Sequence, residues 1–130
     1  MTQKDIVKQW LEIANTDLEA GKDLFNTKKY LLCIFFCHQT LEKHLKAYIL
    51  KTFNRTPPPI HDLVRLSKEA ELLNGFSKFN KLLEELAPFY IKSRYPNYKQ
   101  KVFNKASKAY TSQILDKTNE CVAWLLKKMN

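Results

Sequence analysis

The segment from Tyr30 to Leu50 has the most regular apolar pattern in the chain. Five of its side chains recur at steps of four, three, four and three residues: Ile34, His38, Leu41, Leu45 and Tyr48. Such steps place side chains on one side of an α-helix. Because each exposed Leu, Ile or Phe side chain costs about 1.5 to 3 kcal/mol, other helices should cover that side. We therefore expect this helix to be the centre of the fold.

Similar spacing predicts further helices before and after this one. Together the predicted helices cover about residues 2–25, 28–52, a short stretch from residue 61, residues 77–93 and residues 104–127. The alternating runs around Asn-Gly or Asp-Gly turns that are typical of β-hairpins are missing. We predict an all-α fold, an up-and-down bundle of four to five helices, built by residues 1–130 as a single domain.

Three features of the sequence predict where helices end. The run Pro57-Pro58-Pro59 removes three backbone donors and must be loop. Asn74-Gly75 should end the short third helix, because Gly tolerates the left-handed conformation that follows a helix. Pro88 should kink the fourth helix or break it into two pieces.

The chain carries a net charge of +9, from 22 Lys and Arg against 13 Asp and Glu. The excess is concentrated in residues 96–130, which hold seven basic and two acidic side chains. A positive surface attracts phosphate, so the bias favours an anionic partner, with nucleic acid or nucleotide first. The alternative is that the lysines only keep the protein in solution. No Gly-rich phosphate loop and no Gly-x-Ser-x-Gly elbow occurs, which sets aside NTPase and hydrolase chemistry of those types.

Three cysteines, Cys33, Cys37 and Cys121, cannot all pair within one chain. No signal-peptide pattern precedes Asp5, so we expect reduced thiols in a cytoplasmic protein. The longest apolar run, residues 30–37, is well short of the ~18 residues that span a bilayer, so we expect no membrane association.

Cys33, Cys37 and His38 are spaced to face the same way on a helix, which raises the question of a metal. Zinc needs four ligands, and no Cys-x-x-Cys or His-x-x-x-His completes the set. We predict no metal site and no cofactor, with the cysteines serving as small buried hydrophobic residues. Trp10 and Trp124 are expected in the core or in a dimer interface.

Several separated pieces of the chain resemble one known family. They are Trp10 through Ala14 and Asp17-Leu18 with Ala20, then Cys37-His38-Gln39, Leu41-Glu42-Lys43 and Leu45-Lys46-Ala47, then His61-Asp62-Leu63, and finally Tyr90 with Arg94-Tyr95-Pro96. In this order they resemble the HEPN domain, a small helical family of prokaryotes with eukaryotic relatives. The resemblance implies a helical bundle that commonly dimerises and that acts on nucleotides or nucleic acid. It also implies a minimal nucleotidyltransferase partner, as in toxin-antitoxin systems, because many members are encoded beside one.

A large subset of the family are metal-independent ribonuclease toxins, which carry an arginine followed four to six residues later by a histidine. The matching arginine here is Arg94, but Lys99, Gln100 and Lys101 occupy the histidine positions. Cleavage through the RNA 2′-hydroxyl needs a base and an acid, which histidine supplies near neutral pH. We therefore lean against an enzyme, and keep as an alternative a variant ribonuclease that uses Arg94 with Tyr95 or Tyr98, or a histidine folded back from upstream.

Two groups of residues are candidates for a nucleotide-binding site. Arg94, Tyr95 and Tyr98 combine a planar phosphate donor with rings that stack on a base. The second group could line a pocket that faces this segment: Lys43 and Lys46, with Gln39 and Glu42 beside them on the predicted helix 28–52, and His61 at the start of the next helix. The alternative for the second group is structural, because Glu42 and Lys46 are spaced for an i,i+4 ion pair and His61-Asp62 for a helix cap.

The sequence thus leads to three hypotheses about function. The first is a nucleotide- or RNA-binding domain, a homodimer, that acts with a nucleotidyltransferase. The second is the variant ribonuclease toxin described above. The third is a protein-interaction scaffold with no nucleotide ligand, which would dock partners through an apolar patch.

Overall fold

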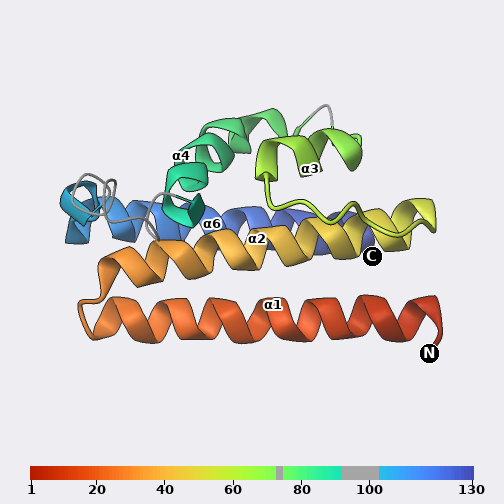
Figure 1. Cartoon of the computed structure of the whole chain (residues 1–130), viewed down its shortest axis with the longest axis horizontal. Helices are drawn as coiled ribbons and strands as arrows, with labels where there is room; N and C mark the ends of the chain where they lie inside the picture. The colour runs from red at the N-terminus through yellow and green to blue at the C-terminus, as the bar shows by residue number, and fades with distance from the viewer. Residues whose placement is uncertain (73–74, 92–102) are drawn as a thin grey trace.

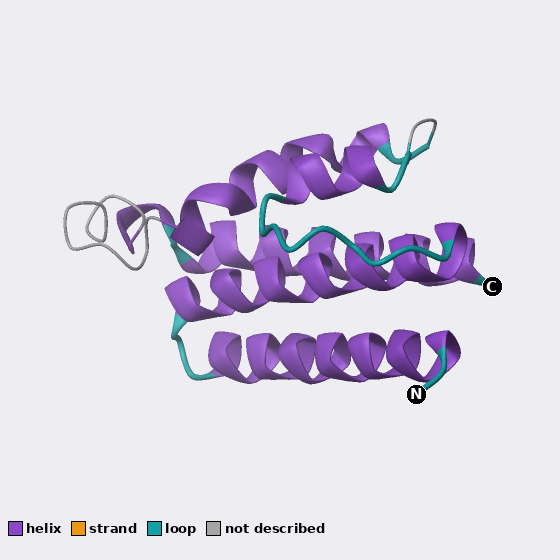
Figure 2. Cartoon of the chain, turned by 45° about the vertical axis from the view of Figure 1, so that its right-hand side comes forward, coloured by secondary structure: helices purple, strands orange, loops and turns teal. Residues whose placement is uncertain are grey.

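The protein is a bundle of helices (Figure 1). The computed structural model describes residues 1–72, 75–91 and 103–130. Every regular element within these ranges is a helix, and they contain no strand (Figure 2). The predicted all-α bundle is confirmed. Both termini lie at the same end of the bundle (Figure 1).

Helices α1 (Gln3–Asn26) and α2 (Tyr30–Phe53) form a long antiparallel pair (Figure 1). Thr2 caps α1 as predicted: its hydroxyl accepts from the Asp5 amide at 3.2 Å, and the Asp5 carboxylate accepts from the Thr2 amide at 3.1 Å. This reciprocal capping satisfies two donors that a helix start otherwise leaves unpaired. Both predicted ranges agree with the structure to within two residues.

Helix α2 is the centre of the fold, as its apolar pattern predicted. It packs against α1, α3 (Leu63–Glu69), α4 (Asn80–Ile91) and α6 (Lys108–Met129). Ile34, Leu41 and Leu45 are fully buried in the core that these helices share. The three cysteines are also buried and free, which agrees with their predicted role as small core residues. No helix within the described residues combines the length and apolarity needed to cross a membrane.

Helix α3 ends at Glu69, five residues before the Asn74-Gly75 pair that was predicted to end it. The Leu72 amide donates to the Ser67 carbonyl and the Glu71 amide to the Lys68 carbonyl, while Glu71 adopts a positive φ of 52°. These are the bonds and the left-handed residue of a Schellman motif, built here without glycine. The prediction missed it because it relied on glycine as the stop signal.

Two other helix boundaries differ from the prediction. A 3₁₀ turn (Ser77–Phe79) leads into α4, which continues through Pro88 to Ile91, so Pro88 does not break the helix, the second of its two predicted effects. Pro88 removes a single helical donor, and the buried face of α4 continues beyond it at fully buried Phe89. The last helix starts at Lys108, four residues later than predicted, because the Ser107 hydroxyl accepts from the Tyr110 amide at 3.1 Å and caps it.

The connection between α1 and α2 provides a test of backbone strain. Lys28 has a φ of 65°, which costs a residue with a Cβ about 1 to 2 kcal/mol. The substitution Lys28→Gly removes that cost but adds an entropic penalty of about 0.4 to 1 kcal/mol. The free energy of unfolding, measured by urea titration, should therefore rise by about 0.5 to 1 kcal/mol. Lys29→Gly is the matched control, because Lys29 has a φ of −95° and pays only the penalty. Equal effects of the two substitutions would contradict this account.

Candidate functional site

Three polar residues, His38, Glu42 and Lys46, follow one another at steps of four along α2 and lie inside the bundle. All three are buried, each with less than a tenth of its surface exposed. Steps of four stack side chains on one face of a helix. A row of ionisable groups therefore runs through the interior, where charges are costly unless they are paired.

The carboxylate of Glu42 is the centre of this row. Its Oε2 accepts from Lys46 Nζ at 3.0 Å and lies 2.9 Å from His61 Nδ1. Its Oε1 is 3.9 Å from His38 Nδ1, too far for a direct hydrogen bond. The predicted i,i+4 pair of Glu42 and Lys46 is thus present, and it is buried rather than at the surface. We refer to His38, Glu42, Lys46 and His61 as the Glu42 cluster.

His38 is the neutral member of the Glu42 cluster. Burial lowers the pKa of its imidazole to about 4, and the attraction of Glu42 only partly opposes this effect. The ring therefore carries no charge near neutral pH, and the cation that balances Glu42 is Lys46. His38 Nδ1 and Glu42 Oε1 are also buried without a hydrogen-bond partner among the described residues. Unsatisfied buried polar atoms are rare in folded proteins, and the described residues hold two others, His44 Nδ1 and Thr111 Oγ1, outside the cluster.

His61 reaches the cluster from the loop between α2 and α3. Asp62 directly after it caps α3 as predicted, with its carboxylate accepting from the Arg65 amide at 3.2 Å. The loop is anchored at its start, where Gln3 Nε2 donates to the Asn54 side chain at 2.6 Å. His61 differs from the rest of the cluster in exposure, since 52% of its side chain is accessible.

Tyr90, near the end of α4, packs against the rings of both His38 and His61. Its ring centroid is 4.6 Å from that of His38, with the planes 15° apart, and 4.9 Å from that of His61. Aromatic contacts at these distances fix ring orientations. The Glu42 cluster thus lies where α2, the loop after it and the end of α4 meet.

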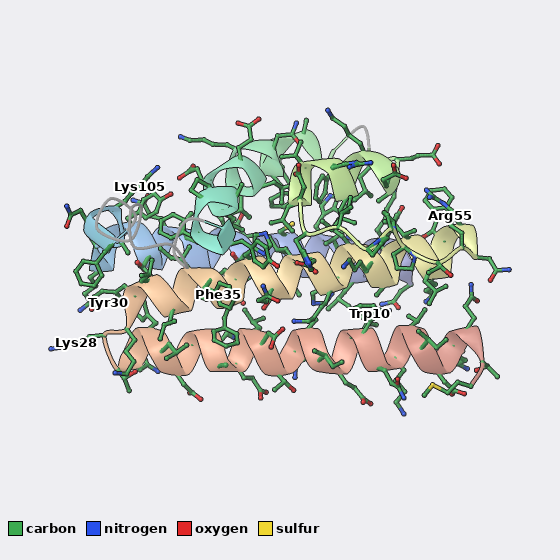
Figure 3. All side chains as sticks on the ribbon, viewed as in Figure 1. Trp10, Lys28, Tyr30, Phe35, Arg55 and Lys105 are labelled. Carbon is green, nitrogen blue, oxygen red and sulfur yellow. The ribbon has the colours of Figure 1, made fainter. Side chains whose placement is uncertain are left out.

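A groove adjoins the other end of the row, at Lys46. The Lys46 ammonium lies 5.7 Å above the Trp10 ring, which projects from α1 toward α2 (Figure 3). The groove measures about 360 Å³ and is mostly apolar; it is lined by Ile6, Trp10, Lys46, Leu50, Thr56 and Pro57 to Pro59. Trp10 is half-buried there.

Of the predicted site residues, two lie at Glu42, one lies elsewhere, and three fall outside the described residues. Lys46 and His61 meet on the same carboxylate oxygen, Glu42 Oε2. Lys43 points elsewhere: it forms an ion pair with Asp17 of α1 and also donates to Gln39 at 3.3 Å. Arg94, Tyr95 and Tyr98 lie outside the described residues, so their role stays a prediction.

The sequence analysis placed His38 in the apolar row, weighed it as a metal ligand, and named both His38 and Tyr90 in the family resemblance, but it gave neither a role in binding. Their contacts with the cluster were missed, and so was the contact of Trp10 with Lys46. One signal was available for His38: it precedes Glu42 by four residues, the same step that suggested the Glu42–Lys46 pair. No spacing along the chain links Tyr90 or Trp10 to Glu42, because they come from other helices; only the family resemblance included them.

Among the described residues, the lysines of α6 are spread along the length of the helix. Lys108 begins α6, whereas Lys127 and Lys128 end it, about 30 Å away along the helix. Lys117 between them pairs with Glu120 at 3.6 Å. A second cavity, of about 510 Å³, lies between α4 and α6, and none of the predicted site residues lines it. No group of three or more metal-ligating side chains occurs in the part of the chain that the structure describes.

The buried charge pair predicts a large effect of Glu42→Gln on stability. The substitution leaves the Lys46 ammonium, only 7% exposed, without its carboxylate. Breaking a buried pair in this way costs about 3 to 5 kcal/mol, which urea unfolding should detect. Glu120→Gln breaks an exposed pair and should cost at most about 1 kcal/mol. The double variant Glu42→Gln/Lys46→Met should recover much of the loss, and a failure to recover any would contradict this account.

The buried histidines predict that stability falls in mild acid. Burial lowers the pKa of His38 and of His44 to about 4, below the value of about 6.5 in an unfolded chain. The unfolded chain therefore binds more protons in this range, so their contribution is complete above about pH 6.5 and is lost toward pH 4. Each of the two histidines should lower the free energy of unfolding by on the order of 2 kcal/mol between about pH 7 and pH 5. Urea titrations at both pH values test this, and His44→Gln should show a weaker pH dependence.

Comparisons with known proteins agree with this architecture. No curated protein matches the chain. The crystal structure of an archaeal HEPN homologue has the same fold, with a TM-score of 0.76 over 95% of this chain and 98% of that chain, at 20% sequence identity. The HEPN domain family itself matches residues 7–129. Since this match spans nearly the whole length, the chain belongs to the HEPN domain family.

Proposed function

We propose that this HEPN domain binds a nucleotide or a single-stranded RNA at the surface around His61. The observation that carries the proposal is the Glu42 cluster, in which a buried carboxylate holds an exposed imidazole in one orientation. HEPN domains are generally related to nucleotides or RNA, which supports this class of ligand. The net charge of +9 favours polyanions.

Arg94 belongs to the same proposal. It follows Tyr90 by four residues in the sequence, and Tyr90 packs on His61. We propose that Arg94 binds phosphate through its planar donor fork and that Tyr95 and Tyr98 stack on bases. Lys46 would act from beneath through its 3.0 Å contact with the Glu42 carboxylate, while Lys43 would act only if it left Asp17.

The wider setting of the domain is part of the proposal too. We propose that residues 1–130 act as one domain, as a cytoplasmic homodimer, and together with a minimal nucleotidyltransferase in a system of the toxin-antitoxin type. The resemblance to the family supports this setting, because members of the family often dimerise. Sedimentation at micromolar concentration should report a dimer, and a monomer would contradict this part.

A protein-interaction scaffold is the second candidate function. The observation that favours it is the apolar groove beside Trp10, whose far wall is Pro57 to Pro59. Such a groove fits apolar side chains of a protein partner better than it fits phosphate. In that case RNA should bind weakly and without selectivity.

Calorimetric titration distinguishes the two candidates. ATP, GTP and a short single-stranded RNA are added to the wild type, His61→Ala and Arg94→Ala at two salt concentrations. Nucleotide binding at this surface predicts that each variant loses about tenfold or more in affinity for the preferred ligand, or about 1.4 kcal/mol.

Lys22→Ala is the matched control, because it removes one exposed positive charge from α1, on the side of α2 away from α3 and α4 (Figure 1). Its affinity should stay within about twofold of the wild type, since a single distant charge is largely screened at physiological salt. Affinity that falls with salt equally in all four proteins would contradict a specific site.

A further inference from the structure

We infer that a half-exposed seam along α1 is an interaction surface for a second copy of this chain, whose own α1 lies antiparallel to it across a two-fold axis. Six side chains at alternating steps of four and three residues form this α1 seam: Ile6, Trp10, Ile13, Asp17, Ala20 and Leu24. The inference rests on the homodimer of the proposed function. It assigns that homodimer a surface, an orientation and a register.

The α1 seam is a different side of the helix from the one that α2 covers. The side of α1 toward α2 is formed by four buried residues: Val7, Ala14, Leu18 and Gly21. In the seam, by contrast, 47% of Ile13 is exposed and the other five residues are only half-buried. Figure 1 shows α1 at the edge of the bundle, with α2 next to it. The described residues of one chain thus cover one apolar side of α1 and leave the other open to solvent.

The spacing of the α1 seam predicts that a helix covers it. Alternating steps of three and four residues form the heptad pattern of coiled coils, in which a second helix packs along the seam. The seam is about 27 Å long, because its 18 residues rise by about 1.5 Å each. A second α1 is a helix of 24 residues that carries the same seam, so two copies cover each other completely. Contacts of this self-complementary kind are the ones that a two-fold axis produces.

An antiparallel register matches the seam side chains by size. If the two-fold axis passes at the level of Asn15, Trp10 lies opposite Ala20 of the second copy, and Ile6 lies opposite Leu24. The largest side chain of the seam therefore meets the smallest, which allows the two helices to interdigitate. In a parallel arrangement the two Trp10 rings would lie opposite each other instead.

Asp17 also favours the antiparallel orientation. A parallel pair would place the two Asp17 carboxylates opposite each other, whereas an antiparallel pair places each opposite Ile13. Within its own chain Asp17 forms an ion pair with Lys43, and its side chain is only 14% exposed. Its charge is therefore already balanced when the surface is covered. A single polar residue in such a seam commonly fixes register at some cost in stability.

The outer edge of the α1 seam presents no conflict of charge. The exposed residues that precede three seam positions there are Gln9, Thr16 and Asp23. In the antiparallel register Gln9 lies near Asp23 of the second copy, and the two Thr16 side chains meet. The Gln9 amide can donate to that carboxylate, and no like charges face each other.

The same axis supplies an occupant for the apolar groove beside Trp10. Gly21 of α1 lies beside α2, where an added Cβ would be 3.6 Å from the Phe36 Cβ. Half-buried Phe35 is therefore about six residues from the axis at Asn15, at the same distance as the groove on the other side. Figure 3 shows Trp10 and Phe35 toward opposite ends of α1. The two-fold thus brings Phe35 of the second copy to the apolar groove of about 360 Å³.

Analytical ultracentrifugation tests the surface with the wild type, Ile13→Glu and Asn15→Glu. Glu at position 13 is buried twice in the dimer, so the dissociation constant of the dimer should rise by about a hundredfold or more. Asn15→Glu is the matched control, because it places the same side chain at an exposed position on the opposite side of α1. Its dissociation constant should stay within about twofold of the wild type. Circular dichroism should show both variants folded, since Ile13 is already 47% exposed in the single chain.

Disulfide cross-linking tests the register, and it does not depend on the folding of Ile13→Glu. Ile6→Cys and Leu24→Cys are prepared as two separate proteins. The native cysteines are buried and should stay unreacted. Under mild oxidation an equal mixture of the two proteins should form covalent dimers, whereas neither protein should do so by itself.

The outcomes separate this inference from the proposed homodimer. A wild type that stays monomeric at micromolar concentration overturns both. A dimer that Ile13→Glu and Asn15→Glu affect equally overturns the inference and leaves the homodimer standing. Cross-linking of Ile6→Cys or Leu24→Cys with itself, or no cross-linking in the mixture, overturns the antiparallel register in the same way. None of these measurements needs a nucleotide or RNA, so their results are independent of the proposed ligand.

Discussion

The rest of this structure depends on one interaction, the pairing of the buried Glu42 carboxylate with Lys46 and His61. A charge inside a protein costs several kcal/mol unless it is paired and hydrogen-bonded. Glu42 meets this condition only when Lys46 extends along the same helix and His61 arrives from the following loop. The next residue of the same loop, Asp62, caps α3. The buried charge thus couples the position of the loop to the central helix.

This coupling also explains why a polar cluster persists in the middle of an otherwise apolar bundle. Well-packed apolar residues would stabilise the bundle at least as well as a buried ion pair does. The cluster leaves two buried polar atoms without partners, on His38 and on Glu42, which costs further stability. Conflicts of this kind are expected where function imposes its own requirements. In the function that we propose, the exposed His61 at the edge of the cluster is the group that contacts the ligand.

The helix pattern was predicted well where it depended on local signals. The ranges of α1 and α2, the caps at Thr2 and Asp62 and the central place of α2 all follow from spacing or from neighbouring residues. Boundaries were missed where a residue broke the usual preference: Glu71 supplied the left-handed turn expected of glycine, and Pro88 was tolerated inside α4. At Glu71 two backbone hydrogen bonds close the turn, and at Pro88 the apolar face of α4 continues to fully buried Phe89, so the context outweighed the preference of one residue.

The sequence by itself determined the helical class, the central helix, the excess of positive charge and the pairing of Glu42 with Lys46. These features depend on periodicity and on residues close together in the chain, which a helix brings into contact without help from elsewhere. Only the tertiary structure decided which partners the other charged side chains contact. Lys43 turns to Asp17, 26 residues away, and His61 turns to Glu42, 19 residues away. Spacing along the chain does not encode such contacts, because they depend on the path of a loop and on the packing of one helix against another.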